Sequence, residues 1–280
     1  MKLSALYSQI KSSLEEELSV SVITLMNPSK KNGSTKLLID SNEKVSGNID
    51  IPTNITNILK KHVYKKMNTH AFATIFILEI DKKTLLINEY HDKNLIKDLQ
   101  DNKKIFFLIE LLYPKLKLII VGGGHVGLAL AQLAEVLGFE IIIVDDREEY
   151  ANNERFPMAK QIHCDKIANS LNKITIDHLS YVVLVSRGHK LDEEALEFVV
   201  ETSASYIGMI GSKRRTKIVL DNLLSKGISA ENLNKVFTPV GLNLGGQSPG
   251  EIGLSILAEI IQLIHQGDGS SLKTQRRALE

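Results

Sequence analysis

The spacing of hydrophobic residues changes near position 116 of the chain. Beyond that point, short continuous apolar runs alternate with segments in which apolar residues recur at every third or fourth position. The first pattern is typical of strands buried on both faces, and the second of helices that pack on a sheet. The alternation predicts strands at 116–121, 140–144, 181–185, 205–210 and 236–237, and helices at 126–137, 192–202, 213–226 and 249–265. The predicted fold is therefore α/β, with a Rossmann-like doubly wound parallel sheet.

Residues 1–115 show shorter alternating patterns and are rich in lysine and asparagine. Apolar residues at helical spacing predict an amphipathic helix at the N-terminus (Leu3, Leu6, Ile10 and Leu14). The rest of this half predicts strands at 21–25 and 35–40 around a turn-rich segment at 27–33, a helix at 55–67, and a hairpin of 71–80 and 83–90 around Asp81-Lys82. We therefore predict an α+β domain at 1–115, a Rossmann-like domain at 116–267 and a tail at 268–280, with Tyr113-Pro114-Lys115 at the boundary.

Composition narrows the class of protein. The 280 residues are 43% hydrophobic and 24% charged, as in ordinary globular proteins, and their net charge is +1. So small a charge creates no field that would draw the chain to nucleic acid or to a membrane, and neither is an expected partner. No apolar run approaches the roughly 20 residues of a membrane helix, and the N-terminus lacks the long apolar segment of a signal peptide. A single cysteine, Cys164, excludes a disulfide within the chain, so we expect a cytoplasmic protein.

The segment Gly122-Gly123-Gly124-His125-Val126-Gly127 fits the G-x-G-x-x-G pattern of dinucleotide-binding turns. It lies between a predicted strand and a predicted helix, and Asp145 ends the next strand. Glycines let a phosphate approach the backbone, the helix N-terminus offers free N–H groups, and the acidic residue can hold a ribose. The alternative is a glycine turn that serves only strand–helix packing. The candidates for ligand contact in this region are Gly122, Gly124, His125, Gly127 and Asp145.

The residues after the second strand bear on the kind of nucleotide. Asp145 and Asp146 favour a free ribose over a 2′-phosphate, because a carboxylate repels the phosphate. Arg147 weakens that preference. The alternative is that all three belong to a solvated turn.

Three more segments end or follow predicted strands and are rich in glycine and polar residues. They are Ser186–His189, Gly208–Ser212 and Pro239–Gln247. Because ligands of doubly wound sheets bind beyond the carboxyl ends of the strands, we expect these loops to meet the Gly122–Gly127 turn at one site. These loops add the candidates Arg187, His189, Gly211, Gly241, Asn243 and Gly245.

A basic turn opens the helix predicted at 213–226. Lys213, Arg214 and Arg215 stand at its start, where the helix dipole disfavours cations by roughly 0.3–1 kcal/mol per group. An anion bound to Ser212 and the helix amides would remove that penalty. The alternative is a solvated basic face. We include Ser212, Lys213, Arg214 and Arg215 among the ligand-binding candidates.

His125, His189 and Cys164 carry reactive groups without a complete catalytic or metal-binding set around them. Two histidines without a third ligand are a weak metal signal, so we predict no metal site and expect structural or substrate-orienting histidines. A lone cysteine at the end of an apolar stretch is usually a small buried residue. We therefore expect Cys164 to be buried and not to act as a nucleophile.

Several blocks of the second half resemble the XdhC/CoxI family of xanthine dehydrogenase accessory factors. In chain order these blocks are Ile120–Gly127, Val144–Arg147, Arg155–Pro157, Arg187–Asp192, Tyr206–Arg215, Pro239–Gly245, Ser248–Ile252 and Ser255–Ile260. Their ordered combination is specific. The first half is a weaker match: Pro28, Lys30, Lys31 and Gly33 stand where the family has a Ser-Pro-Arg-type turn. Val45–Asp50 stands in place of a glycine-rich segment, with most of the glycines gone.

The resemblance implies a cytoplasmic accessory factor that binds molybdenum cofactor (molybdopterin). It implies support for sulfuration of the cofactor by a cysteine desulfurase, and for its insertion into a molybdenum hydroxylase client of xanthine dehydrogenase type. It also favours a cofactor-binding chaperone over a catalyst, and no catalytic residue is assigned. A helper must contact its client, and a homodimer with an open flank is the assembly we expect.

Two other functions stay open. The Rossmann fingerprint alone fits an NAD(P)-binding oxidoreductase, although the sequence shows no evident acid–base set such as Tyr-x-x-x-Lys. The other function is that of a regulatory or scaffolding relative that has lost its ligand. Binding measurements with NAD(H), NADP(H), CTP and molybdenum cofactor discriminate among the three.

Overall fold

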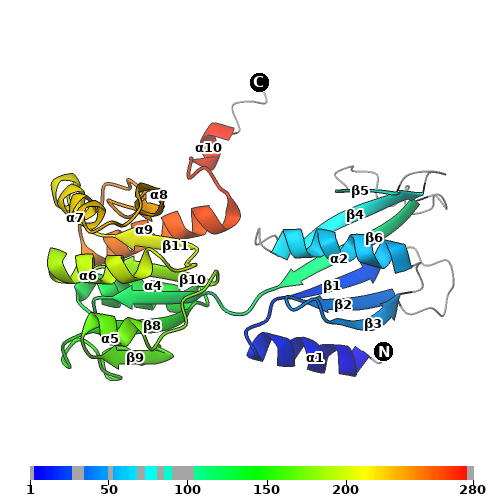
Figure 1. The fold of residues 1–280 in the computed structure, drawn as a ribbon, viewed down its shortest axis with the longest axis horizontal. Coiled ribbons are helices and arrows are strands. Elements are labelled where there is room, and N and C mark those ends of the chain that lie inside the picture. Colours follow the sequence, from blue (N-terminus) through cyan, green and yellow to red (C-terminus); the bar gives the residue numbers. More distant parts are fainter. Residues whose placement is uncertain are drawn as a thin grey trace. The chain divides into compact units, whose positions relative to one another are not determined.

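The structure is a computed structural model that describes residues 3–26, 35–49, 53–67, 73–80, 85–89 and 104–275. The chain divides into two compact units, Met1–Pro114 and Lys115–Glu280 (Figure 1). The turns predicted at 27–33 and at Asp81-Lys82 lie outside the described residues, as do the last residues of the predicted tail.

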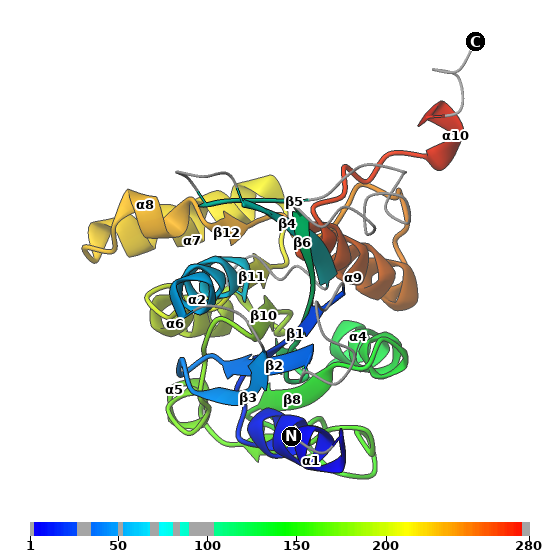
Figure 2. The ribbon, with the colours of Figure 1, turned by 90° about the vertical axis from the view of Figure 1, so that its right-hand side faces the viewer.

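The first unit holds a six-stranded antiparallel sheet in the order β3-β2-β1-β6-β4-β5. Its strands are β1 (Val20–Leu25), β2 (Thr35–Asp40), β3 (Val45–Ile49), β4 (Ala73–Ile80), β5 (Leu85–Glu89) and β6 (Lys104–Leu112). Helices α1 (Leu3–Glu15) and α2 (Thr53–Met67) cover its two faces (Figure 2). Leu38 of β2 packs with α1, whereas Leu37 and Ile39 pack with α2, because alternate residues of a strand point to opposite faces.

The second unit is built on a six-stranded parallel sheet. Its strands are β7 (Lys117–Val121), β8 (Glu140–Asp145), β9 (Gln161–Cys164), β10 (Ser180–Leu184), β11 (Tyr206–Met209) and β12 (Val236–Phe237). They lie in the order β9-β8-β7-β10-β11-β12, which is the 3-2-1-4-5-6 order of dinucleotide-binding Rossmann domains. The predicted α/β fold is confirmed, and the glycine turn lies between β7 and the helix that follows it.

Helices cover both faces of this parallel sheet. Helices α4 (His125–Val136) and α9 (Pro249–His265) lie on one face, and α5 (Ile167–Leu171), α6 (His189–Val199) and α7 (Lys213–Ser225) lie on the other (Figure 1). In β7, Leu118 and Ile120 pack toward α4 and α9, while Ile119 and Val121 pack toward α5, α6 and α7. Burial on both faces explains why these strands are continuous apolar runs. Two short helices, α8 (Ala230–Leu233) and α10 (Leu272–Gln275), also belong to this unit.

The structure contains elements that the sequence patterns did not predict. Strand β9 lies at the edge of its sheet with exposed or half-buried side chains, so it lacks the apolar run of a central strand. Strand β6, which was also not predicted, lies between β1 and β4 at the centre of the antiparallel sheet.

Helix α9 begins as its sequence indicates, because Ser248 and Glu251 form a reciprocal capping box around Pro249.

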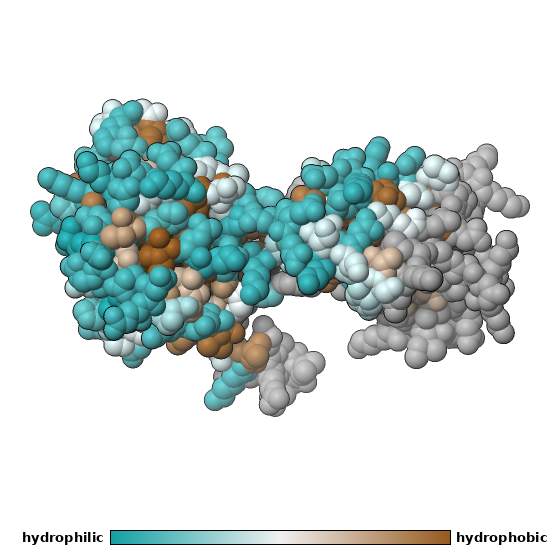
Figure 3. Space-filling view, turned by 90° about the horizontal axis from the view of Figure 1, so that it is seen from below, coloured by the Kyte–Doolittle hydropathy of each residue, from teal (hydrophilic) through white to brown (hydrophobic). Residues whose placement is uncertain are grey.

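The surface of the second unit is mostly hydrophilic, with small separate apolar areas, on the face drawn in Figure 3. Within the described ranges, no helix combines the length and the apolar character that crossing a bilayer requires.

Candidate functional site

The four loops predicted to form a site all leave the carboxyl ends of parallel strands. The Gly122–Gly127 turn follows β7, Ser186–His189 follows β10, and the other two loops follow β11 and β12. The strand order reverses between β7 and β10, and ligands of doubly wound sheets bind at such a switch point. The topology therefore brings the four loops to one edge of the sheet.

Packing within the chain requires three of the four glycines in the turn after β7. Gly122 has a φ of +119°, which side chains rarely adopt. A Cβ at Gly123 would lie 2.0 Å from the carbonyl oxygen of Tyr150, and a Cβ at Gly127 would lie 2.0 Å from that of Gly122. These glycines let the backbone segments approach closely, so their presence is explained without any ligand.

Gly124 is different, because apart from its two chain neighbours no described residue has an atom within 4 Å of the position that its Cβ would take. It is the N-cap of α4, with φ −65° and ψ −166°, and no side chain caps this helix or places a carboxylate in its first turn. The first N–H groups of α4 thus lack a side-chain partner, as in anion-binding helix termini. Gly188 is the equally open and uncapped N-cap of α6. His125 and His189 are the exposed first residues of these two helices.

Both carboxylate oxygens of Asp145 are engaged by neighbouring groups of the protein. The Gly123 N–H donates to Oδ2 at 2.8 Å. Arg147 donates from Nε to Oδ1 at 2.9 Å and from Nη2 to Oδ2 at 3.0 Å. Burial would raise the pKa of Asp145, but the donors on Arg147 and Gly123 outweigh it and hold the pKa below its ordinary value. In this arrangement Asp145 stabilises the glycine turn, and a ribose could reach it only by displacing Arg147.

We expect the second unit to lose stability in acid partly because Asp145 becomes protonated. Its lowered folded pKa means that its contribution is complete above the ordinary value and is lost as the pH falls through the folded value. Asp145→Asn should cost about 2 kcal/mol of unfolding free energy at neutral pH, because a charged acceptor with several donors is lost. The difference between the two proteins should shrink as the pH falls below about 4. Urea unfolding at a series of pH values measures this, and a difference independent of pH would contradict the assignment.

The segment between β8 and β9 covers the glycine turn. The guanidinium of Arg147 stacks over the ring of Tyr150, with its carbon 3.7 Å from the ring centroid. Arg155 donates from Nε to the carbonyl oxygen of Gly123 at 2.9 Å, and its buried Nη2 has no hydrogen-bond partner among the described residues. The sequence had singled out Arg155 only through the family resemblance. Its contact with Gly123 gives it a structural role at the candidate site.

A surface ion pair links the loops after β8 and β10. Nη2 of Arg187 lies 3.0 Å from Oδ2 of Asp146, and both side chains keep access to solvent. β8 and β10 are the neighbours of β7 on either side. The ion pair therefore joins the loops on the two sides of β7, the strand that carries the glycine turn. A ligand that binds the Arg187 guanidinium in place of Asp146 would break this ion pair.

The loops after β11 and β12 form a groove of about 640 Å³, here called the carboxyl-edge groove. Its lining residues are Ile210, Gly211, Lys213, Pro239–Gln247, Ile252 and Ser255. The groove brings together five predicted site residues, namely Gly211, Lys213, Gly241, Asn243 and Gly245. The glycine turn and the Ser186–His189 loop do not line it. A Cβ at Gly253, next to Ile252 of the groove, would lie 3.2 Å from the backbone nitrogen of Leu130, so the start of α9 packs against α4.

Helix α9 fixes the glycine-rich loop of this groove. The Gly241 N–H donates to Oε2 of Glu259 at 3.1 Å, and the buried hydroxyl of Tyr206 donates to the same oxygen. Oγ of Ser255 donates to the Leu242 carbonyl oxygen at 2.7 Å. Glu259, Ser255 and Tyr206 belong to blocks of the resemblance, but the sequence did not indicate that they position the loop.

The basic side chains in the first turn of α7 have different surroundings: one lines the groove, and the others lie on the surface outside it. Ser212 accepts a hydrogen bond from the Arg215 N–H, so its hydroxyl caps the helix. Lys213 lines the carboxyl-edge groove, whereas Arg214 and Arg215 do not. All three cations are exposed and make no ion pair within the described part of the chain. Lys213 is thus the basic residue placed to meet a ligand in the groove.

The expectation that Cys164 is buried is wrong. It is exposed at the carboxyl end of β9, because an edge strand leaves its last side chain uncovered. Partial burial, followed by the nearby carboxylates of Glu148, Asp145 and Asp146, raises the pKa of the thiol. A raised pKa disfavours the thiolate, which is the nucleophilic form.

We still expect Cys164→Ser to leave ligand affinity within about twofold of wild type, about 0.4 kcal/mol, because this thiol lines neither the groove nor the glycine turn. Calorimetric titration of phosphate-bearing ligands measures the effect. A large loss of affinity in a folded variant would show that the site extends to β9.

A family model and two relatives match the sequence of this chain. A family model described as the XdhC Rossmann domain matches residues 118–260. Over 166 residues the chain is 31% identical to the uncharacterized protein YqeB of Escherichia coli (strain K12), covering 59% of this chain and 30% of that protein. Over 154 residues it is 31% identical to a probable xanthine dehydrogenase subunit of Bacillus subtilis (strain 168), covering 55% of this chain and 44% of that protein. The chain thus spans less than half the length of these relatives.

A solved structure shares the fold. The crystal structure of a xanthine dehydrogenase from Bacillus halodurans aligns with 94% of this chain and 97% of its own, with a TM-score of 0.53 and 20% identity.

Proposed function

The chain belongs to the XdhC family, and from this membership we propose that it is an accessory factor for the maturation of a xanthine dehydrogenase-type molybdenum hydroxylase. In this role it binds molybdenum cofactor, a pterin that carries a phosphate, and delivers it to the client enzyme. The similarity to the Bacillus subtilis protein named for xanthine dehydrogenase supports this choice of client.

The observation that carries the proposal is the open backbone at Gly124. The neighbouring glycines are explained by packing, but the free space at Gly124 and the uncapped start of α4 are not. A phosphate would fill that space and accept hydrogen bonds from the first N–H groups of the helix. The donors present therefore fit the phosphate of the cofactor.

The carboxyl-edge groove provides room for the rest of the cofactor. Its volume of about 640 Å³ lies within the range typical of small-molecule sites. Lys213 would offset negative charge, while Asn243 and the backbone of Gly241 and Gly245 would offer polar contacts. Once in the client, the cofactor supplies a redox-active metal centre; the residues named here bind and orient it.

Three further features complete the proposal. A cysteine desulfurase sulfurates the cofactor while this chain holds it, and the mature cofactor is then inserted into the client. The protein acts as a homodimer that leaves one flank open to these partners.

The alternative is an NAD(P)-binding oxidoreductase, which the Rossmann strand order favours. The engaged carboxylate of Asp145 weighs against it, because a dinucleotide would have to displace Arg147 to reach that residue. Hydride transfer from NADH to a carbonyl substrate that disappears in His189→Ala would favour this alternative.

Calorimetric titration of the full chain with purified molybdenum cofactor, CTP, NADH and NADPH tests the proposal. We expect micromolar binding of molybdenum cofactor and much weaker binding of NADH. Tight NADH binding with no affinity for molybdenum cofactor would overturn the proposal. A matched measurement with Lys213→Gln should show weaker cofactor binding and an unchanged melting temperature.

A further inference from the structure

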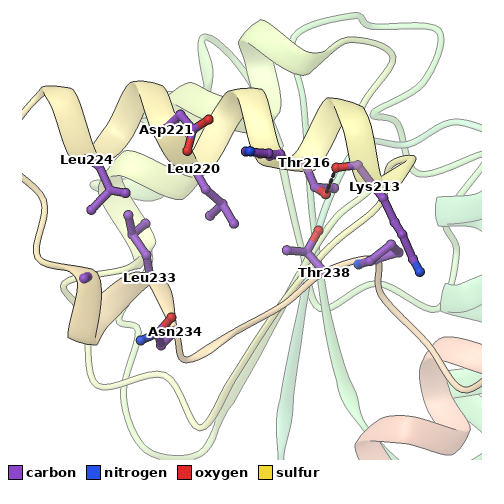
Figure 4. Close-up of a pocket in the computed structure, with 11 residues that line it drawn as sticks. Lys213, Thr216, Leu220, Asp221, Leu224, Leu233, Asn234 and Thr238 are labelled. Atoms are coloured by element: carbon purple, nitrogen blue, oxygen red, sulfur yellow. Dashed lines mark hydrogen bonds between the residues drawn. The ribbon is translucent and has the colours of Figure 1, made fainter.

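A second groove runs along α7, on the side that faces α8. Its α7 wall consists of Lys213, Thr216, Lys217, Leu220, Asp221 and Leu224. These residues recur every three or four positions, so they form one continuous stripe on the helix. Leu233 and Asn234 and the Thr238–Pro239 segment form the opposite side, and the groove has a volume of about 420 Å³. We call it the α7–α8 groove (Figure 4).

The two ends of this groove differ in chemistry. Lys213 and Lys217 lie at the end nearest the start of α7, and neither makes an ion pair with any residue that the structure describes. At the other end, Leu220 and Leu224 point toward Leu233 of α8 (Figure 4). One end of the groove is therefore positively charged, through Lys213 and Lys217, and the other end is lined by leucine side chains.

One carboxylate, that of Asp221, also lines the groove. It lies four residues after Lys217, beside the apolar part of the stripe. A positively charged group of a bound molecule would be attracted to Asp221, beside the leucines. A negatively charged group would be attracted to the end of the groove that Lys213 and Lys217 line.

The dimensions favour a chain segment over a compact small molecule. The stripe from Lys213 to Leu224 is about 16 Å long, the span of about five extended residues. Leu224 remains 44% exposed, so a small ligand would keep much of its own apolar surface in water. Small-molecule sites usually bury most of the ligand.

We propose that the α7–α8 groove docks an extended segment of a partner protein, with acidic residues against Lys213 and Lys217 and leucine-sized residues against Leu220 and Leu224. Lys213 and Pro239 line both this groove and the carboxyl-edge groove, so docking takes place beside the ligand site. The docking site itself does not depend on the proposed function; only the identification of the partner as the client enzyme rests on it.

The test uses a dye-labelled heptapeptide with two glutamates at one end and two leucines at alternate positions after them. Alternate residues of an extended chain share one face, so both leucines can enter the groove. Fluorescence anisotropy with the full chain should show saturable binding. Replacing the glutamates with glutamine, or the leucines with serine, should weaken it. Absence of binding at millimolar protein, or equal binding of the leucine-free peptide, would overturn the proposal.

Two variants of the chain locate the contact. Lys217→Glu should weaken peptide binding about fivefold, which corresponds to about 1 kcal/mol. Lys217 does not line the carboxyl-edge groove, so cofactor binding is not its direct target. Arg214→Glu makes the same charge change on the same helix, outside both grooves, and should alter peptide affinity by less than about twofold.

A peptide with lysines in place of the glutamates should bind Lys217→Glu better than it binds the wild type. Equal losses in Lys217→Glu and Arg214→Glu would indicate general charge attraction and overturn the assignment of the groove. No cofactor is present in these peptide titrations, so a negative result would refute only the proposed docking site. A negative result in the cofactor titration would refute only the proposed function.

Discussion

Replacing Gly124 with valine is expected to abolish most of the affinity for a phosphate-bearing ligand without unfolding the protein. Its backbone dihedral angles are open to any residue, and apart from its chain neighbours no residue in the described ranges approaches within 4 Å of the new Cβ. The added side chain would occupy the space through which a phosphate reaches the first N–H groups of α4. Loss of two charge-assisted hydrogen bonds at about 1.5 kcal/mol each gives about 3 kcal/mol, or roughly a 100-fold loss of affinity.

Calorimetric titration with molybdenum cofactor measures this loss, and thermal unfolding followed by circular dichroism checks the fold. Gly250→Val is the control, because Gly250 is an exposed glycine at the start of α9, and no described residue other than its neighbours in the helix lies within 4 Å of its Cβ position. The control should bind as the wild type does. If Gly124→Val is folded and binds with unchanged affinity, the turn after β7 is not the phosphate site.

Replacing Gly127 with alanine is expected to produce the opposite result, a large loss of stability from one methyl group. The new Cβ would lie 2.0 Å from the carbonyl oxygen of Gly122, which is backbone held between β7 and β8 by the hydrogen bond from its own N–H to Val144. Neither partner can rotate away, so α4 must move off the sheet. Overpacking of this kind costs about 3 kcal/mol, and outweighs the gain of about 1 kcal/mol in helix propensity.

The net loss of about 2 kcal/mol should lower the melting temperature by about 4–8 °C, since 1 kcal/mol corresponds to about 2–4 °C in a unit of this size. Gly124→Ala is the control, and its stability should lie within about 0.5 kcal/mol of wild type. Equal melting temperatures for the two alanine variants would mean that the close approach of α4 to β7 does not limit stability.

The two glycines of this motif are expected to have different roles: Gly127 allows close packing, and Gly124 leaves access for a ligand. The G-x-G-x-x-G pattern places both at a strand–helix turn but does not distinguish their roles. Gly127 faces the backbone of Gly122, whereas Gly124 faces open space.

Five of the six strands of the second unit, and its four longest helices, followed from the sequence alone. Buried parallel strands such as β7 and β8 are continuous apolar runs, and helix α9 begins at a capping box, so both signals are local. Once these elements are in order, topology places the loops after β7, β10, β11 and β12 at one edge. The edge strand β9 gave no such signal, because its side chains are not buried on both faces.

Only the tertiary structure decided which of the predicted side chains are free to act. Asp145 has the sequence position of a ribose ligand, but Gly123 and Arg147 engage its carboxylate. Glu259 is one of many glutamates in the sequence, yet folding brings it to the Gly241 N–H. Cys164 ends an apolar stretch but is exposed, because the sheet ends at β9. Such outcomes depend on contacts between segments far apart in the chain, whereas periodicity and caps report only on residues that are neighbours in sequence.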